Sequence, residues 1–115
     1  MTISFEDLTA GLRVITIAGR LDIQGTQEID IKFTALSCAD NRKVVVDLTQ
    51  VSFLASIGIR SLITNAKALK SRGGRMVLFV GENAGVIRTL QETGIDVILP
   101  LFTEMNEATA AAVAG

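Results

Sequence analysis

The sequence predicts an α/β fold, in which a mixed sheet of about five strands begins with an antiparallel hairpin and carries helices mainly on one face. Two observations lead to this prediction. Short β-branched runs alternate along the chain with amphipathic stretches whose apolar residues recur every three or four positions. The first two extended stretches are separated only by Thr9-Ala10-Gly11, and so short a connection makes a hairpin rather than a crossover.

The hairpin is expected to consist of Ile3–Leu8 and Leu12–Ala18, both of which alternate along their length. Gly19–Asp22 is expected to leave the strand. Thr26 is then expected to cap a helix that ends near Ser37. The inward face of this helix should consist of Ile29, Phe33 and Leu36.

Val44–Leu48 has the length and the branching of a buried strand. A polar turn and a short hydrophobic segment follow, and Ser56 then stands where the N-cap of the next helix is expected. A hydroxyl at a helix start also tolerates an anion, because the first backbone amides and the helix dipole favour negative charge. Gly73-Gly74 should end this helix. Its apolar stripe consists of Ile59, Leu62, Ile63, Ala66 and Leu69.

Arg75–Val80 reads as the next strand, and Asn83 as the cap of a helix that runs through Thr93. Asp96–Leu99 is expected to form a last short strand stopped by Pro100, the only proline. A final helix should start near Thr103. The inward residues of the two last helices are expected to be Val86, Ile87, Leu90, Met105, Ala108 and Ala112.

The order of elements explains why most helices should share one face of the sheet. Strand–helix–strand crossovers are right-handed, so successive units wound in one direction place their helices on the same side. We therefore expect the other face of the sheet to serve a partner or a second copy of the chain, as in a homodimer.

The composition of the chain argues against several classes of function. The 115 residues have the length of one domain, and 49% of them are apolar. The formal net charge of −1 lacks the basic excess of a nucleic-acid binder. No apolar run approaches the ~20 residues that span a bilayer, and the first residues lack the pattern of a signal peptide. We expect a cytoplasmic protein that neither binds nucleic acid nor inserts into a membrane.

Several residue types that carry chemistry are missing. The chain has no histidine, which excludes histidine as a general base or metal ligand. A single cysteine, Cys38, can form neither an intramolecular disulfide nor a cysteine-based zinc site. The chain also lacks tryptophan and tyrosine, so a base-stacking platform is not expected. We expect no metal, no cofactor and no enzymatic activity.

One stretch resembles a known family. Asp47–Ile59, read as Asp-Leu-Thr-Gln-Val-Ser-Phe-Leu-Ala-Ser-Ile-Gly-Ile, is similar to the signature of STAS domains, and most of all to bacterial anti-sigma factor antagonists. In that signature the first serine after an acidic residue is phosphorylated. Ser56 takes the place of this serine and Gly58 that of the signature glycine. The departures are Ala55 for the acidic residue, Ile57 for a second hydroxyl residue and Arg60 for a second glycine.

The resemblance extends over nearly the whole chain. Gly19–Asp22 resembles the family's Gly-Glu-Leu-Asp, Lys70–Phe79 its next loop and strand, and Val86–Ile95 its third helix. Residues 1–115 are therefore expected to form one STAS domain.

The resemblance implies a switch in transcription regulation. The unphosphorylated protein would bind an anti-sigma factor that is a serine kinase and thereby release a sigma factor. The kinase would use ATP to phosphorylate Ser56, and a serine phosphatase would reverse the step. The implied partner-binding residues are Asp22, Ser56, Gly58 and Arg60. From position alone, Ser56 and Asp22 also fit caps of local turns, and Arg60 fits an exposed helix arginine.

Two other interpretations stay open. Ala55, in place of the acidic residue, favours a STAS subunit of a stressosome-like scaffold or of a lipid-transport complex. The second is a small nucleotide-binding or thiol-dependent enzyme. Gly81–Gly85 follows a strand and opens a helix, but it lacks the spacing of the known phosphate-binding loops, and a structural role is favoured. Cys38 has no visible activating neighbour and is interpreted as an inert thiol.

Overall fold

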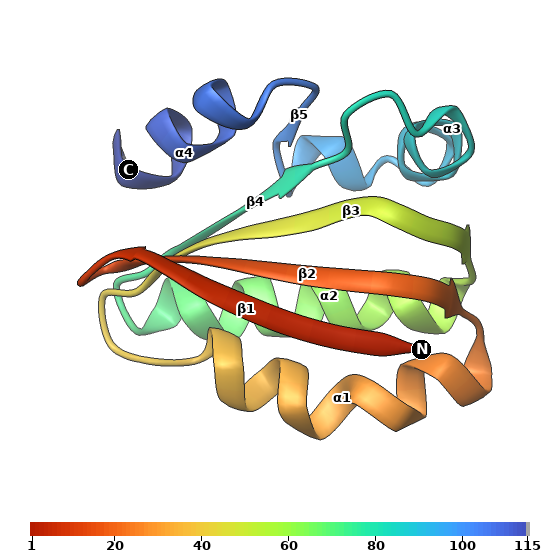
Figure 1. Cartoon of the computed structure of the whole chain (residues 1–115), viewed down its shortest axis with the longest axis horizontal. Helices are drawn as coiled ribbons and strands as arrows, with labels where there is room; N and C mark the ends of the chain where they lie inside the picture. The colour runs from red at the N-terminus through yellow and green to blue at the C-terminus, as the bar shows by residue number, and fades with distance from the viewer. Residues whose placement is uncertain (115) are drawn as a thin grey trace.

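Five strands form one mixed sheet in the computed structural model, which describes residues 1–114 (Figure 1). The strands lie in the order of the chain, with β1 antiparallel to β2 and every later pair parallel. This arrangement confirms the predicted mixed sheet and its hairpin. The strands are β1 (Thr2–Thr9), β2 (Leu12–Leu21), β3 (Lys43–Leu54), β4 (Arg75–Phe79) and β5 (Leu101–Phe102).

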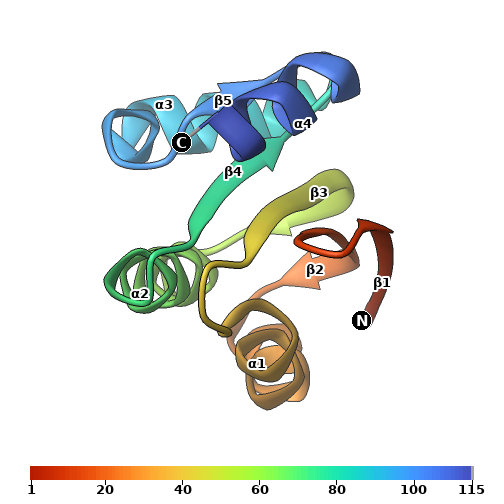
Figure 2. The ribbon, with the colours of Figure 1, turned by 90° about the vertical axis from the view of Figure 1, so that its left-hand side faces the viewer.

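Three of the four α-helices cover one face of the sheet, as predicted, and bury the larger core (Figure 2). Ile15, Phe33 and Leu62 are each at most 1% exposed there. The predicted stripes of the helices face this core, including Ile59 and Leu69. The helices are α1 (Ile23–Ser37), α2 (Ser56–Ser71), α3 (Ala84–Glu92) and α4 (Met105–Ala114), with a 3₁₀ turn, η1 (Ile95–Val97), after α3. None of these helices is long and apolar enough to cross a membrane.

The fourth helix, α4, covers the opposite face of the sheet (Figure 2). Ala108 and Ala112, two of its predicted contact residues, are fully buried, and they pack with Val45 and Val77 of the central strands. The expectation that this face is left for a partner therefore does not hold for its centre. Small side chains let α4 approach the sheet closely, so a short helix suffices as cover.

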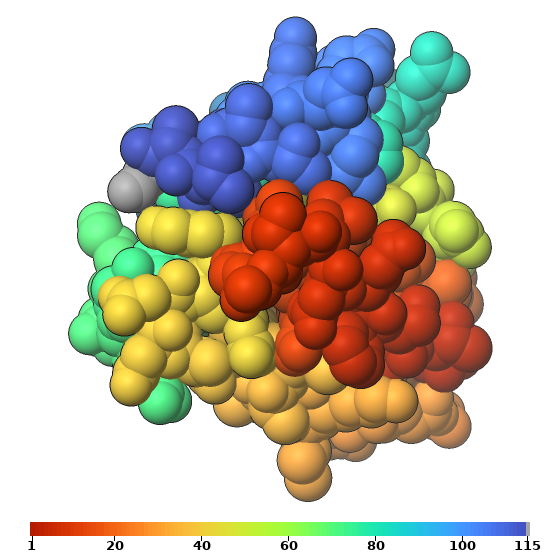
Figure 3. All heavy atoms as spheres, turned by 60° about the vertical axis from the view of Figure 1, so that its left-hand side comes forward, coloured from red at the N-terminus to blue at the C-terminus, as the bar shows by residue number. Residues whose placement is uncertain are grey.

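Arg13 links the N-terminal hairpin to α1 through polar contacts. Its guanidinium donates to both carboxylate oxygens of Asp7, at 2.7 and 3.1 Å, and to the carbonyl of Leu36 at 3.0 Å. It also lies 4.3 Å from the centre of the Phe5 ring. In Figure 3 the hairpin occupies the middle of one face, between α4 and α1, so β1 forms an exposed edge of the sheet.

The start of α1 differs from the prediction. β2 does not end at Ala18 but continues to Leu21, and α1 begins at once at Ile23. Asp22 is the N-cap, whereas Thr26 lies within the helix and is 3% exposed. The reason is that β3 pairs with β2 as far as Leu54, which keeps Gly19–Leu21 within the strand.

β3 is longer than predicted because the polar segment after Leu48 is not a turn. Asp47 Oδ1 accepts hydrogen bonds from the backbone N–H and the hydroxyl of Thr49, at 2.9 and 2.7 Å. The register against β2 shifts here and again near Phe53, and at each place β3 holds one residue more than β2. Two bulges therefore bend the strand without ending it.

The last strand is also placed differently. Asp96–Leu99 does not form a strand; η1 lies there instead, and β5 follows Pro100. Leu78 N–H donates to the carbonyl of Pro100 at 2.9 Å, and Val80 N–H to that of Phe102 at 2.9 Å. Proline lacks a donor but keeps its acceptor, so it can begin this pairing rather than stop it. Gly94, with φ of +74°, ends the helix before η1 as predicted.

Candidate functional site

The predicted site residues Asp22 and Ser56 lie at the carboxyl ends of β2 and β3, where α1 and α2 begin (right-hand side of Figure 1). Leu21 and Leu54 are paired in the parallel ladder, and Ala55 N–H donates to the carbonyl of Leu21 at 2.9 Å. Parallel strands bring their carboxyl ends to the same edge. The pairing therefore brings Asp22 and Ser56 to the same end of the sheet, although 34 positions separate them in the chain.

Ser56 is exposed and is the first residue of α2. The N-cap is Ala55, not Ser56 as predicted, because the bond from Ala55 N–H to β2 keeps Ala55 extended. Ala55 makes no side-chain capping hydrogen bond, and within residues 1–114 no other side chain is seen to cap the amino end of α2. The positive end of the helix dipole thus stays open beside an accessible hydroxyl, a position that tolerates added negative charge.

Asp22 caps α1 and also contacts β2. Its Oδ1 accepts from Gly25 N–H at 2.8 Å, and its Oδ2 lies 3.4 Å from Arg20 Nε. These contacts lower the pKa of the Asp22 carboxyl below its usual value, chiefly through the Gly25 hydrogen bond and then through Arg20. The interpretation of Asp22 as a local cap is confirmed. Its side chain keeps 39% of its surface exposed, so it is also accessible to a partner.

The capping contact makes a pH-dependent contribution to stability. Because the pKa of Asp22 is lower in the folded protein, its contribution is present above about pH 4 and is lost as pH falls through the folded-state pKa. Asp22→Asn keeps a capping oxygen but removes the charge. We expect this variant to be less stable than wild type at pH 7 and the difference to shrink at about pH 3. Urea denaturation at both pH values measures it.

Asp22→Ala is the companion variant, since it removes the cap as well as the charge. We expect it to be less stable than Asp22→Asn at both pH values. A stability difference between wild type and Asp22→Asn that does not change with pH would contradict the assignment.

The other two predicted residues lie on α2. Gly58 is buried, and an added Cβ would lie 3.0 Å from the Leu21 Cβ and 3.0 Å from Leu54 Cδ1. It lets the first turn of α2 approach the strand ends closely. Arg60 is exposed, one helical turn after Ser56, beside a groove of about 280 Å³ between α1 and α2.

Two exposed apolar residues that the sequence interpretation did not include lie close in the chain to Asp22 and Ser56. Ile23 is 65% exposed and Phe53 is 43% exposed. The Arg20 guanidinium lies 4.5 Å from the centre of the Phe53 ring, across paired positions of β2 and β3. Their position in the sequence could have identified Ile23 and Phe53, because each is a large apolar residue within three positions of a predicted site residue.

The Gly81–Gly85 segment, interpreted from the sequence as structural, forms a turn and the start of a helix. Gly81, with φ of +54°, forms the turn after β4, and Asn83 is the N-cap of α3. Cys38 is partly buried, with its Sγ 3.7 Å from Asn65 Oδ1 and 3.8 Å from Ser37 Oγ. Within residues 1–114, no group of three or more cysteine, aspartate or glutamate residues could hold a metal ion.

Comparison with known proteins gives one family and one fold. The family model described as STAS domain matches residues 7–108. No curated protein sequence matches the chain. Among solved structures, an anti-sigma factor antagonist from Mycobacterium paratuberculosis is similar with a TM-score of 0.85 and 23% identity, over 97% of this chain and 93% of that one.

Three further solved structures share the fold. An anti-sigma factor antagonist domain protein from Planctomyces limnophilus has a TM-score of 0.79 and 27% identity, over 96% of this chain and 97% of its own. Unphosphorylated SpoIIAA, an anti-sigma factor antagonist, has a TM-score of 0.75 and 19% identity, over 99% and 98% of the two chains. The phosphorylated form of SpoIIAA, from Bacillus, has a TM-score of 0.64 and 19% identity, over 92% and 96%.

Proposed function

Since the chain belongs to the STAS domain family, we propose that it is an anti-sigma factor antagonist whose binding to a serine-kinase anti-sigma factor is switched by phosphorylation of Ser56. The observation that carries this proposal is the exposed Ser56 hydroxyl at the uncapped start of α2. The protein would act in the cytoplasm and without enzymatic activity of its own. Its fold is shared with anti-sigma factor antagonists, one of which exists in phosphorylated and unphosphorylated forms.

The position of Ser56 explains how a phosphate could be added without unfolding the domain. A phosphate adds about −1.5 to −2 charges and three acceptor oxygens. At the positive end of α2 this charge is favourable, because no side chain competes for the first amides. Arg60, one turn further along the same exposed side, would neutralise part of it.

The expected effect is therefore on the partner and not on the fold. Ser56, Asp22 and Arg60 are accessible charged or polar groups, and Ile23 and Phe53 supply exposed apolar area beside them. Apolar anchors surrounded by polar groups are typical of binding surfaces. Gly58 would contribute indirectly, by seating α2 so that Ser56 reaches the surface. A phosphate in this surface would repel or displace the partner until a serine phosphatase removes it.

The test is phosphorylation by the cognate kinase. Incubation of the wild-type protein with the kinase and ATP is expected to add the mass of one phosphate, as measured on the intact protein. Ser56→Ala should gain none. In size-exclusion chromatography, the phosphorylated wild type should no longer elute with the kinase, whereas Ser56→Ala should remain bound in the presence of ATP.

Ser52→Ala provides the matched control, because Ser52 is also exposed and lies four residues before Ser56. It should be phosphorylated like wild type. A phosphate that persists in Ser56→Ala would reject Ser56 as the target.

A second candidate function rests on Ala55, which replaces the acidic residue of the family signature. It would be a subunit of a stressosome-like scaffold or of a lipid-transport complex, with the same surface held permanently by its neighbours. Light scattering of the protein purified from its own cells distinguishes the two. A permanent multi-subunit assembly favours this candidate, whereas a small free species favours the switch.

A further inference from the structure

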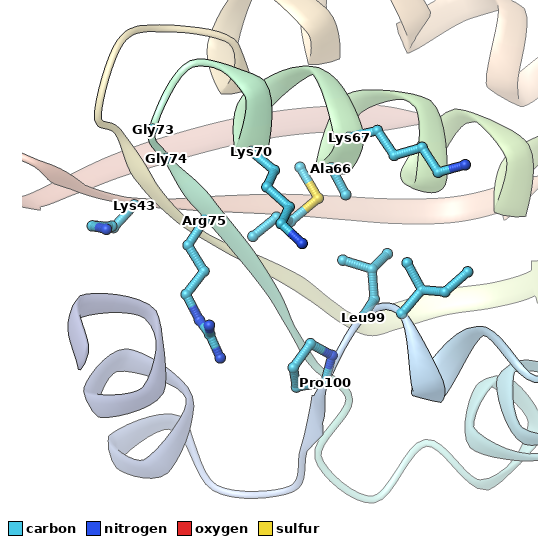
Figure 4. Close-up of a pocket in the computed structure, with 11 residues that line it drawn as sticks. Lys43, Ala66, Lys67, Lys70, Gly73, Gly74, Arg75, Leu99 and Pro100 are labelled. Carbon is cyan, nitrogen blue, oxygen red and sulfur yellow. The ribbon is translucent and has the colours of Figure 1, made fainter. Parts of the chain in front are cut away.

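A cleft of about 460 Å³ lies at the end of α2 that is opposite to Ser56 (Figure 4). It is bounded by the last turns of α2, the start of β4 and the segment that leads into β5. The cleft exists because β5 pairs only with Leu78 and Phe79. The first part of β4, Arg75–Val77, is therefore an open edge that no strand covers in the described chain.

The charges in this cleft are of one sign. Four cationic residues line it, from three different elements, and no acidic residue of the described part of the chain does so. None of the four takes part in an ion pair within residues 1–114. Such a concentration is notable in a chain whose net charge is −1. The four are Lys43, Lys67, Lys70 and Arg75.

Arg75 has unused hydrogen-bonding capacity among the described residues. Its Nε is buried, yet it has no hydrogen-bond partner among the residues that the structure describes. A buried donor without an acceptor costs about 1–3 kcal/mol, and more when it is charged. Lys70 alone could be explained by the negative end of the α2 dipole. That explanation does not extend to Arg75 and Lys43, which lie at the start of strands.

The remaining surface of the cleft is apolar and aliphatic. Met76, Ile98, Leu99 and Pro100 line it, and no aromatic residue does. Figure 4 shows Lys70 extending from α2 toward Leu99, whereas Arg75 extends from β4 on the side away from α2, with Pro100 beside it. Cationic groups from both sides of the open β4 edge therefore lie next to an apolar surface. The absence of aromatic side chains from this lining offers no stacking partner for a nucleotide base.

We propose that this cleft binds a phosphate monoester with a compact aliphatic body, its phosphate held by Lys70 and Arg75 and its body against Leu99 and Pro100. A phosphate monoester carries nearly two negative charges near neutral pH and three acceptor oxygens. It can therefore pair with several cations at once, which a single carboxylate does less completely. Small-molecule sites typically have volumes of about 300–1,000 Å³, and this cleft falls within that range.

Isothermal titration calorimetry with three probes tests the proposal: hexyl phosphate, inorganic phosphate and 1-hexanol, near neutral pH. Hexyl phosphate is expected to bind with one-to-one stoichiometry and more tightly than inorganic phosphate, while 1-hexanol gives no measurable binding. Arg75→Gln should weaken the binding of hexyl phosphate by about tenfold or more, because one charged hydrogen bond is lost. Lys70→Gln, at an exposed position, should weaken it severalfold.

Arg88→Gln is the matched control, since Arg88 is exposed on α3 and does not line the cleft. It should bind hexyl phosphate like wild type. Three results would each overturn the proposal: equal affinity for hexyl and inorganic phosphate, binding of 1-hexanol as tight as that of hexyl phosphate, or wild-type affinity in both Arg75→Gln and Lys70→Gln. Phosphorylation of Ser56 should be unchanged in Lys70→Gln. The proposed ligand site and the proposed phosphorylation switch can therefore be refuted independently.

Discussion

Gly25→Ala is expected to lower the free energy of unfolding by about 3 kcal/mol or more. Gly25 is the third residue of α1, and an added Cβ would overlap the backbone carbonyl oxygen of Arg20. It would also lie 3.2 Å from Asp22 Oδ1. The backbone of β2 cannot give way as a flexible side chain could, so the start of α1 must move and lose its cap. Urea denaturation followed by circular dichroism measures the change.

Gly85→Ala gives the comparison at an equivalent type of position. Gly85 is the second residue of α3. Beyond its chain neighbours and the backbone of its own helix, no heavy atom of the described residues lies within 4 Å of an added Cβ. Alanine is the better helix former, so this variant should be stabilised by about 0.4–1 kcal/mol. If Gly25→Ala were as stable as Gly85→Ala, the close approach of α1 to β2 would be refuted.

Asn83→Asp is expected to lower the free energy of unfolding by about 2–4 kcal/mol at pH 7. Asn83 does more than cap α3 through its Oδ1, which accepts from Val86 N–H at 3.5 Å. Its Nδ2 donates to the carbonyl of Leu48 at 3.0 Å and to that of Val51 at 2.8 Å. Aspartate keeps the cap but places a carboxylate oxygen against these two carbonyls.

The stability of Asn83→Asp at pH 7 and at low pH distinguishes two roles of Asn83. If it were only a cap, aspartate would be neutral or stabilising, because both residues cap well and the helix dipole favours the charge. If the donor matters, part of the loss should be recovered at low pH, where the protonated carboxyl can again donate to one carbonyl. Asn106→Asp, at an exposed position of α4, should change stability by less than about 0.5 kcal/mol.

Asn83 also illustrates which parts of the fold the sequence could predict. Helix faces follow from a regular period, and the inward positions of α2 and α3, such as Leu62 and Leu90, were correct. Contacts between distant segments have no such period. The bulged part of β3 depends on a donor that lies more than 30 positions further along the chain, at Asn83. Sequence reasoning therefore interpreted the same polar segment, after Leu48, as a turn.

The caps show the same limit at the candidate site. Ser56 and Thr26 have residue types that suit an N-cap, yet Ala55 and Asp22 occupy those positions. Where each helix starts is decided by how far β2 and β3 remain paired, which local residue preferences do not encode. Asp22 and Ser56 were nevertheless both expected among the partner-binding residues. The exposed Ile23 and Phe53 were not, because exposure depends on what the rest of the chain leaves uncovered.

Helix α2 runs the length of the sheet, with Ser56 at one end and Lys70 near the other (Figure 1). Its 16 residues correspond to about 24 Å. A protein docked around Ser56 and a small phosphate compound in the cleft would therefore not compete for space. Because the two sites lie at opposite ends of one helix, a ternary complex is possible, in which the domain binds its protein partner and a small phosphate compound at the same time.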